Sequence, residues 1–315
     1  MTKFSKLLPA LVTVSILVVP ALLAAARSEP PEPSALARAI AAARDSGPGP
    51  FGLRVDSTGA EGHRSLEVFP SGVAIWNGRA QLRLAPAQRS ALLEALLAGG
   101  FPSLEPSYGG RPGAAPERAA LRVVRRVVLE IGGLSASSVQ LAEGEQSPKL
   151  ERLTEALLDL VAPLAGDGIT ADDLGDGLAK LATGVLAPET FTLRFVELPP
   201  PGSEAAGSIL RVSQGTATRQ SYTPGREIGE PVSRSLSDEQ LDALVAALRA
   251  AGLSTLPVNM WSDDHLELEL TVLEHRQSLV ARPFSRLSPE ALGEAQKRFE
   301  KLVDALEELG ASLTP

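Results

Sequence analysis

Apolar and polar residues alternate along several short stretches of this chain, so that apolar side chains stand two positions apart. This is the spacing of one face of a β-strand. It appears at Leu53 and Val55, at Leu66 and Val68, at Val73 and Ile75, at 127–131, and at Val139 and Leu141. The alternation is clearest at 266–270, where we expect Leu268 and Leu270 to face a core and Glu267 and Glu269 to face solvent. Short turns between successive strands predict an antiparallel sheet.

Other stretches carry apolar residues three and four positions apart, which is the period of a helix. Helices are predicted at 86–98 and 238–251, and each is followed by glycine, the residue that most readily adopts the left-handed conformation at a helix end. Shorter helices are predicted after two N-capping residues: Ser34, before a helix through Ala43, and Thr170, before a helix that carries Leu174, Leu178 and Leu181.

The two longer helices are copies of one sequence. Without a gap, 85–106 aligns with 237–258, and the identical pairs are Gln88 and Gln240, Ala91 and Ala243, Leu92 and Leu244, Ala95 and Ala247, Leu96 and Leu248, Gly100 and Gly252, and Leu104 and Leu256. A later amphipathic segment, 150–160, matches 299–309 in its apolar positions and charge signs. The sequence therefore predicts an α+β fold, a tandem duplication of a small antiparallel sheet module packed with two helices in the order ββαββα.

The N-terminus has the pattern of an export signal. Lys3 and Lys6 precede the apolar run 7–26, which ends in small residues at 24–26. We expect residues 1–26 to be a signal peptide and the protein to be periplasmic or secreted. The alternative is an uncleaved segment that anchors the chain in a membrane, because about 20 apolar residues can span a bilayer.

The remaining chain divides into two modules with two connecting segments. We expect a Pro-rich spacer with a short helix at 27–50, a first module at 51–165, a linker with a short helix at 166–190 and a second module at 191–315. There is no cysteine, so neither a disulfide nor a lipidated cysteine is available to the chain. The net charge of −8 argues against binding to nucleic acid.

A search for catalytic motifs is negative. None of the three histidines stands in a zinc-binding spacing, and no cysteine is available as a nucleophile. No serine-hydrolase elbow, phosphate-binding loop or dinucleotide-binding loop is present. The acidic run 168–177 lacks the alternating ligands of a calcium loop and is instead interpreted as a capped helix start. We therefore predict no catalytic residue, no metal site and no cofactor.

Three residues are candidates for binding a partner: Tyr108, Trp261 and His265. Tyr108 and Trp261 follow the first helix of their modules at equivalent positions, and such aromatic residues often anchor interfaces. The alternative is that each ring covers the edge of its own core. His265 lies among Asp263, Asp264 and Glu267, which could orient its imidazole or coordinate a cation; the alternative is a solvated turn before a strand.

The order of these elements resembles the emfourin-like domains. The residues that carry the resemblance are the helix closing in Gly100-Phe101-Pro-Ser-Leu104, an aromatic residue soon after it, a strand pair and a final helix. The resemblance covers both modules. Some members of that family inhibit thermolysin-type metalloproteases of bacteria, so it implies a metalloprotease partner, contacted through the loop at 57–62 and its counterpart at 199–207.

These observations predict an exported, non-catalytic interaction protein of two homologous modules whose partner is another envelope or secreted protein. In its sharper form the protein is a protease inhibitor. Two alternatives stay open: an enzyme whose site is formed between the modules from residues far apart in sequence, and a structural protein of the cell envelope.

Overall fold

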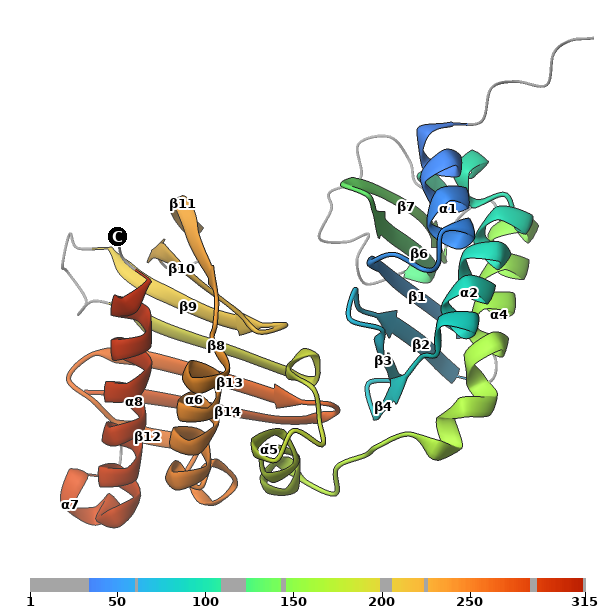
Figure 1. Ribbon diagram of the computed structural model, residues 1–315. Helices are drawn as coiled ribbons and strands as arrows, with labels where there is room; N and C mark the ends of the chain where they lie inside the picture. Colours follow the sequence, from blue (N-terminus) through green and yellow to red (C-terminus); the bar gives the residue numbers. More distant parts are fainter. Residues whose placement is uncertain are drawn as a thin grey trace, which may run out of the picture.

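A computed structural model describes residues 34–59, 62–108, 123–142, 146–198, 206–223, 226–283 and 288–313. It contains two similar modules, each with a seven-stranded sheet that carries helices on one face (Figure 1). The predicted α+β fold and its duplication are therefore confirmed. The predicted signal at 1–26 lies outside the described residues.

The first module begins with a helix and ends with one. Its elements are α1 (Ala35–Asp45), β1 (Phe51–Gly59), β2 (Gly62–Val68), β3 (Val73–Trp76), β4 (Ala80–Arg83), α2 (Pro86–Ala98), η2 (Phe101–Ser103), β5 (Ser107–Tyr108), β6 (Val123–Ile131), β7 (Leu134–Leu141), α4 (Pro148–Val161) and η3 (Ala162–Asp167). The strand order is β4-β3-β2-β1-β6-β7-β5. Neighbouring strands are antiparallel except β5, which runs parallel to β7.

The second module repeats this plan. Its elements are α5 (Leu174–Ala182), η4 (Pro188–Thr190), β8 (Phe191–Leu198), β9 (Gly207–Ser213), β10 (Thr216–Thr223), β11 (Arg226–Ser235), α6 (Asp238–Ala251), η5 (Leu253–Thr255), β12 (Asn259–Trp261), β13 (His265–Val272), β14 (His275–Arg282), α7 (Pro289–Leu292) and α8 (Glu294–Ser312). The strand order β11-β10-β9-β8-β13-β14-β12 matches that of the first sheet, and β12 is again parallel to its neighbour.

The predicted order ββαββα has too few strands. Four strands precede α2 and α6, and one short strand follows each of these helices. β4 has four residues and β5 has two, too few for an alternation to be recognised. β11 is missed for another reason, because 229–235 are exposed throughout and so leave no apolar face in the sequence.

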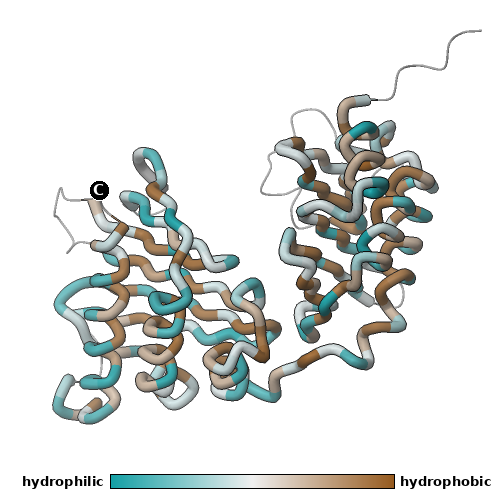
Figure 2. The backbone as a smooth tube through the Cα atoms, viewed as in Figure 1, coloured by the Kyte–Doolittle hydropathy of each residue, from teal (hydrophilic) through white to brown (hydrophobic). Residues whose placement is uncertain are grey.

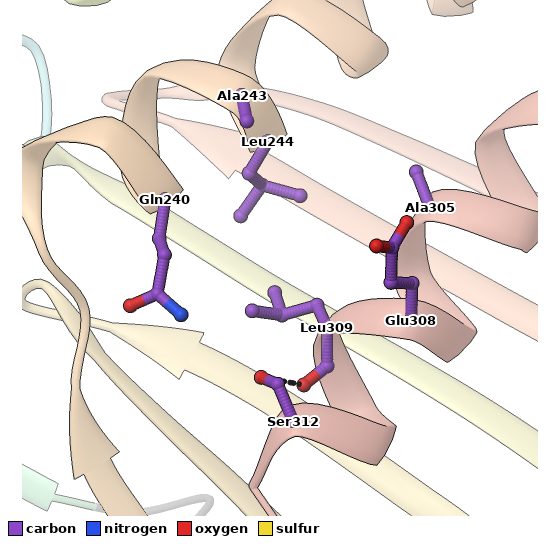
Figure 3. A pocket seen from close by; sticks show the side chains of 7 residues that line it. All are labelled: Gln240, Ala243, Leu244, Ala305, Glu308, Leu309 and Ser312. Atoms are coloured by element: carbon purple, nitrogen blue, oxygen red, sulfur yellow. Dashed lines mark hydrogen bonds between the residues drawn. The ribbon is translucent and has the colours of Figure 1, made fainter.

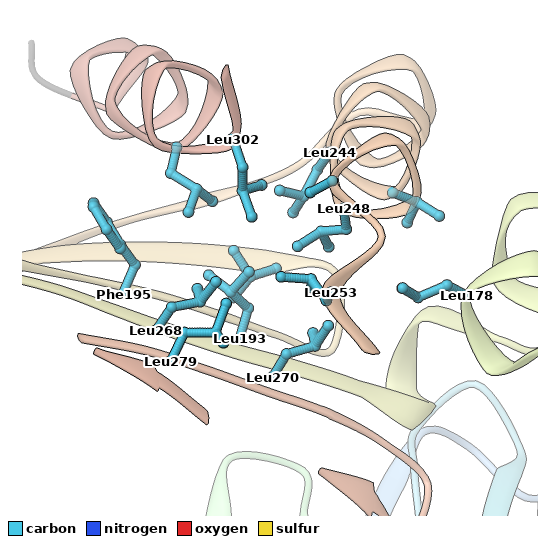
Figure 4. Close-up of a cluster of buried hydrophobic side chains, with 14 of the residues drawn as sticks. Leu178, Leu193, Phe195, Leu244, Leu248, Leu253, Leu268, Leu270, Leu279 and Leu302 are labelled. Atoms are coloured by element: carbon cyan, nitrogen blue, oxygen red, sulfur yellow. The ribbon is translucent and has the colours of Figure 1, made fainter. Parts of the chain in front are cut away.

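Each core lies between the sheet and three helices. In the second module, Leu193, Phe195, Leu268 and Leu270 point from the strands toward α6 and α8 (Figure 4). Leu268 and Leu270 are thus buried as predicted. Apolar positions recur along the helices and central strands of both modules (Figure 2).

The short helices predicted in the spacer and the linker contribute to these cores. Ile40 of α1 is fully buried against the first module, and Leu178 of α5 is buried against the second. Ser34 caps α1 as predicted, with its Oγ accepting a hydrogen bond from the amide of Ala37 at 3.1 Å. The N-cap of α5 is Asp173 and not the predicted Thr170, because the Asp173 carboxylate reaches the amide of Asp176 at 2.8 Å.

Gln81 of β4 joins the first module to the linker. Its backbone pairs with Ile169 through two hydrogen bonds of 2.8 Å. Its buried side chain accepts from the amide of Ala187 at 2.6 Å and donates to the carbonyl of Val185 at 3.2 Å. Every polar group of this residue is therefore satisfied by the linker. An ion pair between Arg79 and Glu274, with 2.8 Å between Nε and Oε2, lies at the same junction.

Candidate functional site

The predicted aromatic residues lie at the edges of the two sheets. Tyr108 ends β5 and packs partly buried against the first core, with its hydroxyl accepting from the amide of Glu105 at 3.0 Å. Trp261 ends β12 and packs partly buried against the second core. Each ring thus covers part of its own core, and a role for either one in binding a partner stays a prediction.

Tyr108 and Trp261 are not equivalent, which corrects the sequence prediction by one residue. β5 begins at Ser107 and β12 at Asn259, and each of these residues pairs with a valine of the neighbouring strand. Tyr108 therefore corresponds to Met260, which is fully buried. The strand register decides the match, whereas the sequence comparison had matched the residues by aromatic type.

His265 is the first residue of β13 and lies beside a carboxylate on the same face of the strand. Its Nε2 is 3.3 Å from Oε1 of Glu267, whose Oε2 is 3.4 Å from Nη1 of Arg194. Across the described ranges, no group of three or more histidine, aspartate or glutamate side chains is arranged to hold a metal ion. The observed arrangement is a row of polar side chains, with an ion pair between Glu267 and Arg194, on the sheet face opposite the helices.

This row of side chains lies at the far end of β13 from the module junction. Glu274, which pairs with Arg79 of the first module, lies two residues after the last residue of β13. At the usual rise of a strand, β13 is about 24 Å long. Among the residues that the structure describes, no side chain of the first module forms a hydrogen bond or ion pair with His265.

The hairpin that joins β1 and β2 is fixed to the last helix of its module. Ser57, the first residue of the predicted contact loop, is buried, and its Oγ donates to Glu155 at 2.9 Å. Arg64 donates to Glu155 at 2.9 Å and to Asp159 at 2.7 Å, and its guanidinium lies over the ring of Trp76. Of the described residues next to the turn, Thr58, Gly59, Gly62 and His63 are exposed and could contact a partner. Most of the counterpart loop, 199–205, lies outside the described residues.

The corresponding end of the second module is acidic. Oε2 of Glu197 accepts from the hydroxyl of Ser208 at 3.3 Å. The pKa of Glu307 is raised, first by partial burial and then by the nearby carboxylates of Glu197, Asp304 and Asp264. The proton is thus held more tightly there than in water.

Both modules have an apolar groove between their first long helix and their last helix. The first groove, between α2 and α4, has a volume of about 760 Å³ and is lined by Ala91, Glu94, Ala95, Ala98, Gly99, Lys149, Arg152, Leu153, Ala156 and Leu160. The second groove, between α6 and α8, has a volume of about 230 Å³ and is lined by Gln240, Ala243, Leu244, Ala305, Glu308, Leu309 and Ser312 (Figure 3).

The two grooves are made by equivalent small residues. Ala91 of the first groove aligns with Ala243 of the second, and Ala156 aligns with Ala305. A helix surface with alanine in place of larger side chains leaves space between the ridges of the two helices. The sequence did not predict these grooves, because alanine has a high helix propensity and its presence in a helix does not by itself indicate a groove. The one indication in the sequence was that alanine recurs at the same positions in both copies.

Comparison with known proteins does not add a family: neither a protein-family model nor a curated protein sequence matches this chain. No helix within the described ranges is both long enough and apolar enough to cross a membrane.

Proposed function

We propose that this is an exported protein that acts by binding another protein and has no catalytic site of its own. The observation that supports this most is the pair of grooves, a concave surface that both modules build from equivalent residues. Grooves between helices are common docking sites for helical segments of other proteins.

The positions of the polar residues also favour binding over catalysis. A nucleophile needs a general base within hydrogen-bond reach, held in place by a third group. His265 lies near only one ionised partner, Glu267, and both belong to the same strand. This pair has no hydroxyl nucleophile within hydrogen-bond distance in the described part of the chain.

Affinity capture tests the proposal. The chain from 27 to 315, which retains every described residue, would be the bait for envelope and secreted proteins of the native host. We expect one captured protein to be lost when a groove is filled by Ala156→Trp or Ala243→Trp, both at exposed positions of a groove wall. A matched surface control is Val232→Trp on β11, outside both grooves. Capture of the same proteins by all variants would contradict a role for the grooves.

In its sharper form, the proposal is that the captured protein is a thermolysin-type metalloprotease that this chain inhibits. The order of elements supports it, as does the hairpin at 57–62, held against α4 by Arg64. Titration of thermolysin with the chain should abolish proteolysis at a defined stoichiometry, and replacement of 59–62 should weaken inhibition. The control is Gly132→Asn in the β6–β7 turn, where the φ of 57° suits asparagine. Inhibition that persists after replacement of both the loop at 57–62 and its counterpart at 199–207 would exclude the proposal that this chain inhibits the protease through these loops.

A further inference from the structure

We propose that the first groove binds an amphipathic helix that carries acidic side chains, and that the second groove does not bind this ligand. The inference rests on the proposed binding function and names the chemistry of one partner. It follows from the shape of the first groove and from the charges that surround it.

The shape of the groove suits a helix better than a small molecule. Its floor is a row of alanines on α2 and α4 with Leu153, and its wall includes Leu160, which is 42% exposed. Pockets for small molecules enclose most of the ligand surface. This groove is instead open along α2, a helix about 20 Å long at the usual rise per residue, and so offers an apolar strip to one face of another helix.

The carboxylates on the two groove helices already have cationic partners. Glu94 of α2 accepts from Nη1 of Arg44 at 2.6 Å. On α4, Glu151 pairs with Arg125, and Glu155 and Asp159 share Arg64. These arginines belong to α1 and to the strands, so each of these carboxylates is paired within the module and none of them pairs with a cation of the groove lining.

Two cations of the groove lack such partners. Lys149 and Arg152 are exposed on the first two turns of α4, and among the described residues neither lies in an ion pair. Arg152 donates only from Nε, to the carbonyl of Pro148 at 3.1 Å, which leaves its terminal nitrogens available. The first groove therefore combines an apolar floor with two cationic side chains that form no ion pair among the described residues, and an acidic helix would complement them.

The second groove has the opposite charge. The one charged residue of its lining is Glu308, and no described cation pairs with it. An acidic helix would be repelled there, although the alanine floor is similar. The second module thus provides an internal control for the charge argument.

Two synthetic peptides would test the inference. Both carry the same leucine and alanine stripe over five helical turns; one has glutamate at its other positions and the second has lysine. Fluorescence anisotropy with the chain from 27 to 315 should detect binding of the acidic peptide below 1 mM. We expect the double variant Lys149→Glu, Arg152→Glu to weaken binding at least about tenfold, and Ala156→Trp to weaken it similarly. Both side chains are exposed, and Lys149 lies in the first turn of α4, where glutamate is favourable, so the double variant should fold.

Lys301→Glu on α8, which aligns with Arg152, is the matched control and should leave binding unchanged. Equal binding of the lysine peptide, binding unaffected by the charge reversal, or no binding at 1 mM would overturn the inference. So would self-association of the chain that the double variant abolishes in sedimentation, because the occupant would then be a second copy. Loss of natural capture with Ala156→Trp, together with failure of the acidic peptide, would leave the binding function intact and reject only the partner chemistry.

Discussion

The two modules share their apolar skeleton but differ in the charges that join the sheet to the last helix. In the first module, Arg64 of β2 lies four residues before Val68, which pairs with Leu53. In the second, Val212 pairs with Leu193, so the residue that corresponds to Arg64 is Ser208. An arginine that links two carboxylates of α4 is thus replaced by a serine.

The difference continues on the partner strand and helix. Ser57, which donates to Glu155, corresponds to Glu197, and the buried Leu158 of α4 corresponds to Glu307 of α8. The second module therefore has more negative charge where the first has a buried leucine and an arginine. Most positions that fill the core are thus kept in both copies, but the position of Leu158 and Glu307 is not, and the charges around it differ as well.

The first long helices, by contrast, share one hydrogen bond at their start and a left-handed glycine after their end. The side chains of Gln88 and Gln240 accept from the amides of Ala85 and Ser237, at 2.7 and 3.0 Å. The glycine that begins the next 3₁₀ turn is left-handed in both modules, with φ of 69° at Gly100 and 60° at Gly252. Local backbone chemistry thus explains why this stretch aligns without a gap.

The largest expected effect separates the two cores. Leu92→Ala and Leu244→Ala remove equivalent leucines, exposed by 0% and 4%, and each should destabilise its own module by about 2–5 kcal/mol. Hydrogen exchange measured at increasing urea concentrations should show that each variant lowers the protection of the backbone amides in its own module only. Equal loss of protection in both modules would mean that they unfold as one unit.

The arginine difference can be exchanged between the modules. Arg64→Ser should destabilise the first module by about 1–2 kcal/mol, because Glu155 and Asp159 lose a shared donor that is 25% exposed. Ser208→Arg should stabilise the second module by a smaller amount. The carboxylates of α8 that the new arginine could pair with are exposed, and ion pairs between exposed side chains contribute little to stability. Thermal melts of the two variants provide the measurement. A neutral Arg64→Ser would show that the pairs around it add no net stability.

The two left-handed glycines allow a finer comparison. Alanine at either position should cost about 1 kcal/mol for the positive φ. Gly252→Ala should cost more, because its Cβ would come within 2.7 Å of the Arg298 guanidinium, whereas at Gly100 the nearest atom is Ser103 Oγ at 3.4 Å. Arg298→Ala combined with Gly252→Ala should remove this excess. The urea midpoints of the single and double variants decide the outcome.

The smallest effect concerns pH. The folded protein raises the pKa of Glu307, so the folded state holds this proton more tightly than the unfolded state. Stability should therefore fall as pH rises from the usual carboxyl range through the raised pKa. Glu307→Gln should stabilise the second module at pH 7, by less than about 1 kcal/mol because the side chain is only partly shielded from water, and should have no stabilising effect at pH 4. Urea midpoints at the two pH values measure this. A gain of equal size at both would exclude titration of Glu307 as the cause.

The sequence predicts the fold best where burial imposes a period. Leu268 and Leu270 alternate with glutamates because only one face of β13 contacts the core. The strand and its buried face are therefore recognisable from the sequence. β11 has no such signal: it is an edge strand with Pro231 and Gly229, and its described side chains are exposed on both faces. Its place in the sheet depends on its pairing with β10, which is not visible in its own residues.

The candidate site was harder to predict than the fold. Tyr108, Trp261 and His265 stand out because they are chemically unusual in this chain, yet the structure places them at three separate strand ends. The grooves consist of common residues, and their shape depends on how two helices far apart in sequence approach each other. At one end of the first groove this approach is close, since a Cβ on Gly99 would lie 2.7 Å from Leu153 Cδ1.

The hydrogen bonds of Gln81 also determine how the protein would respond to force. They hold the linker at Ile169 and again at Val185 and Ala187, so the stretch between these points, which contains α5, is a closed loop fastened to β4. Tension applied to the two ends of the chain would load these bonds before it reached α5. Extension of the linker would therefore require these bonds to break, together with the hydrogen bond from Ser71 to Glu189 and the ion pair between Arg79 and Glu274.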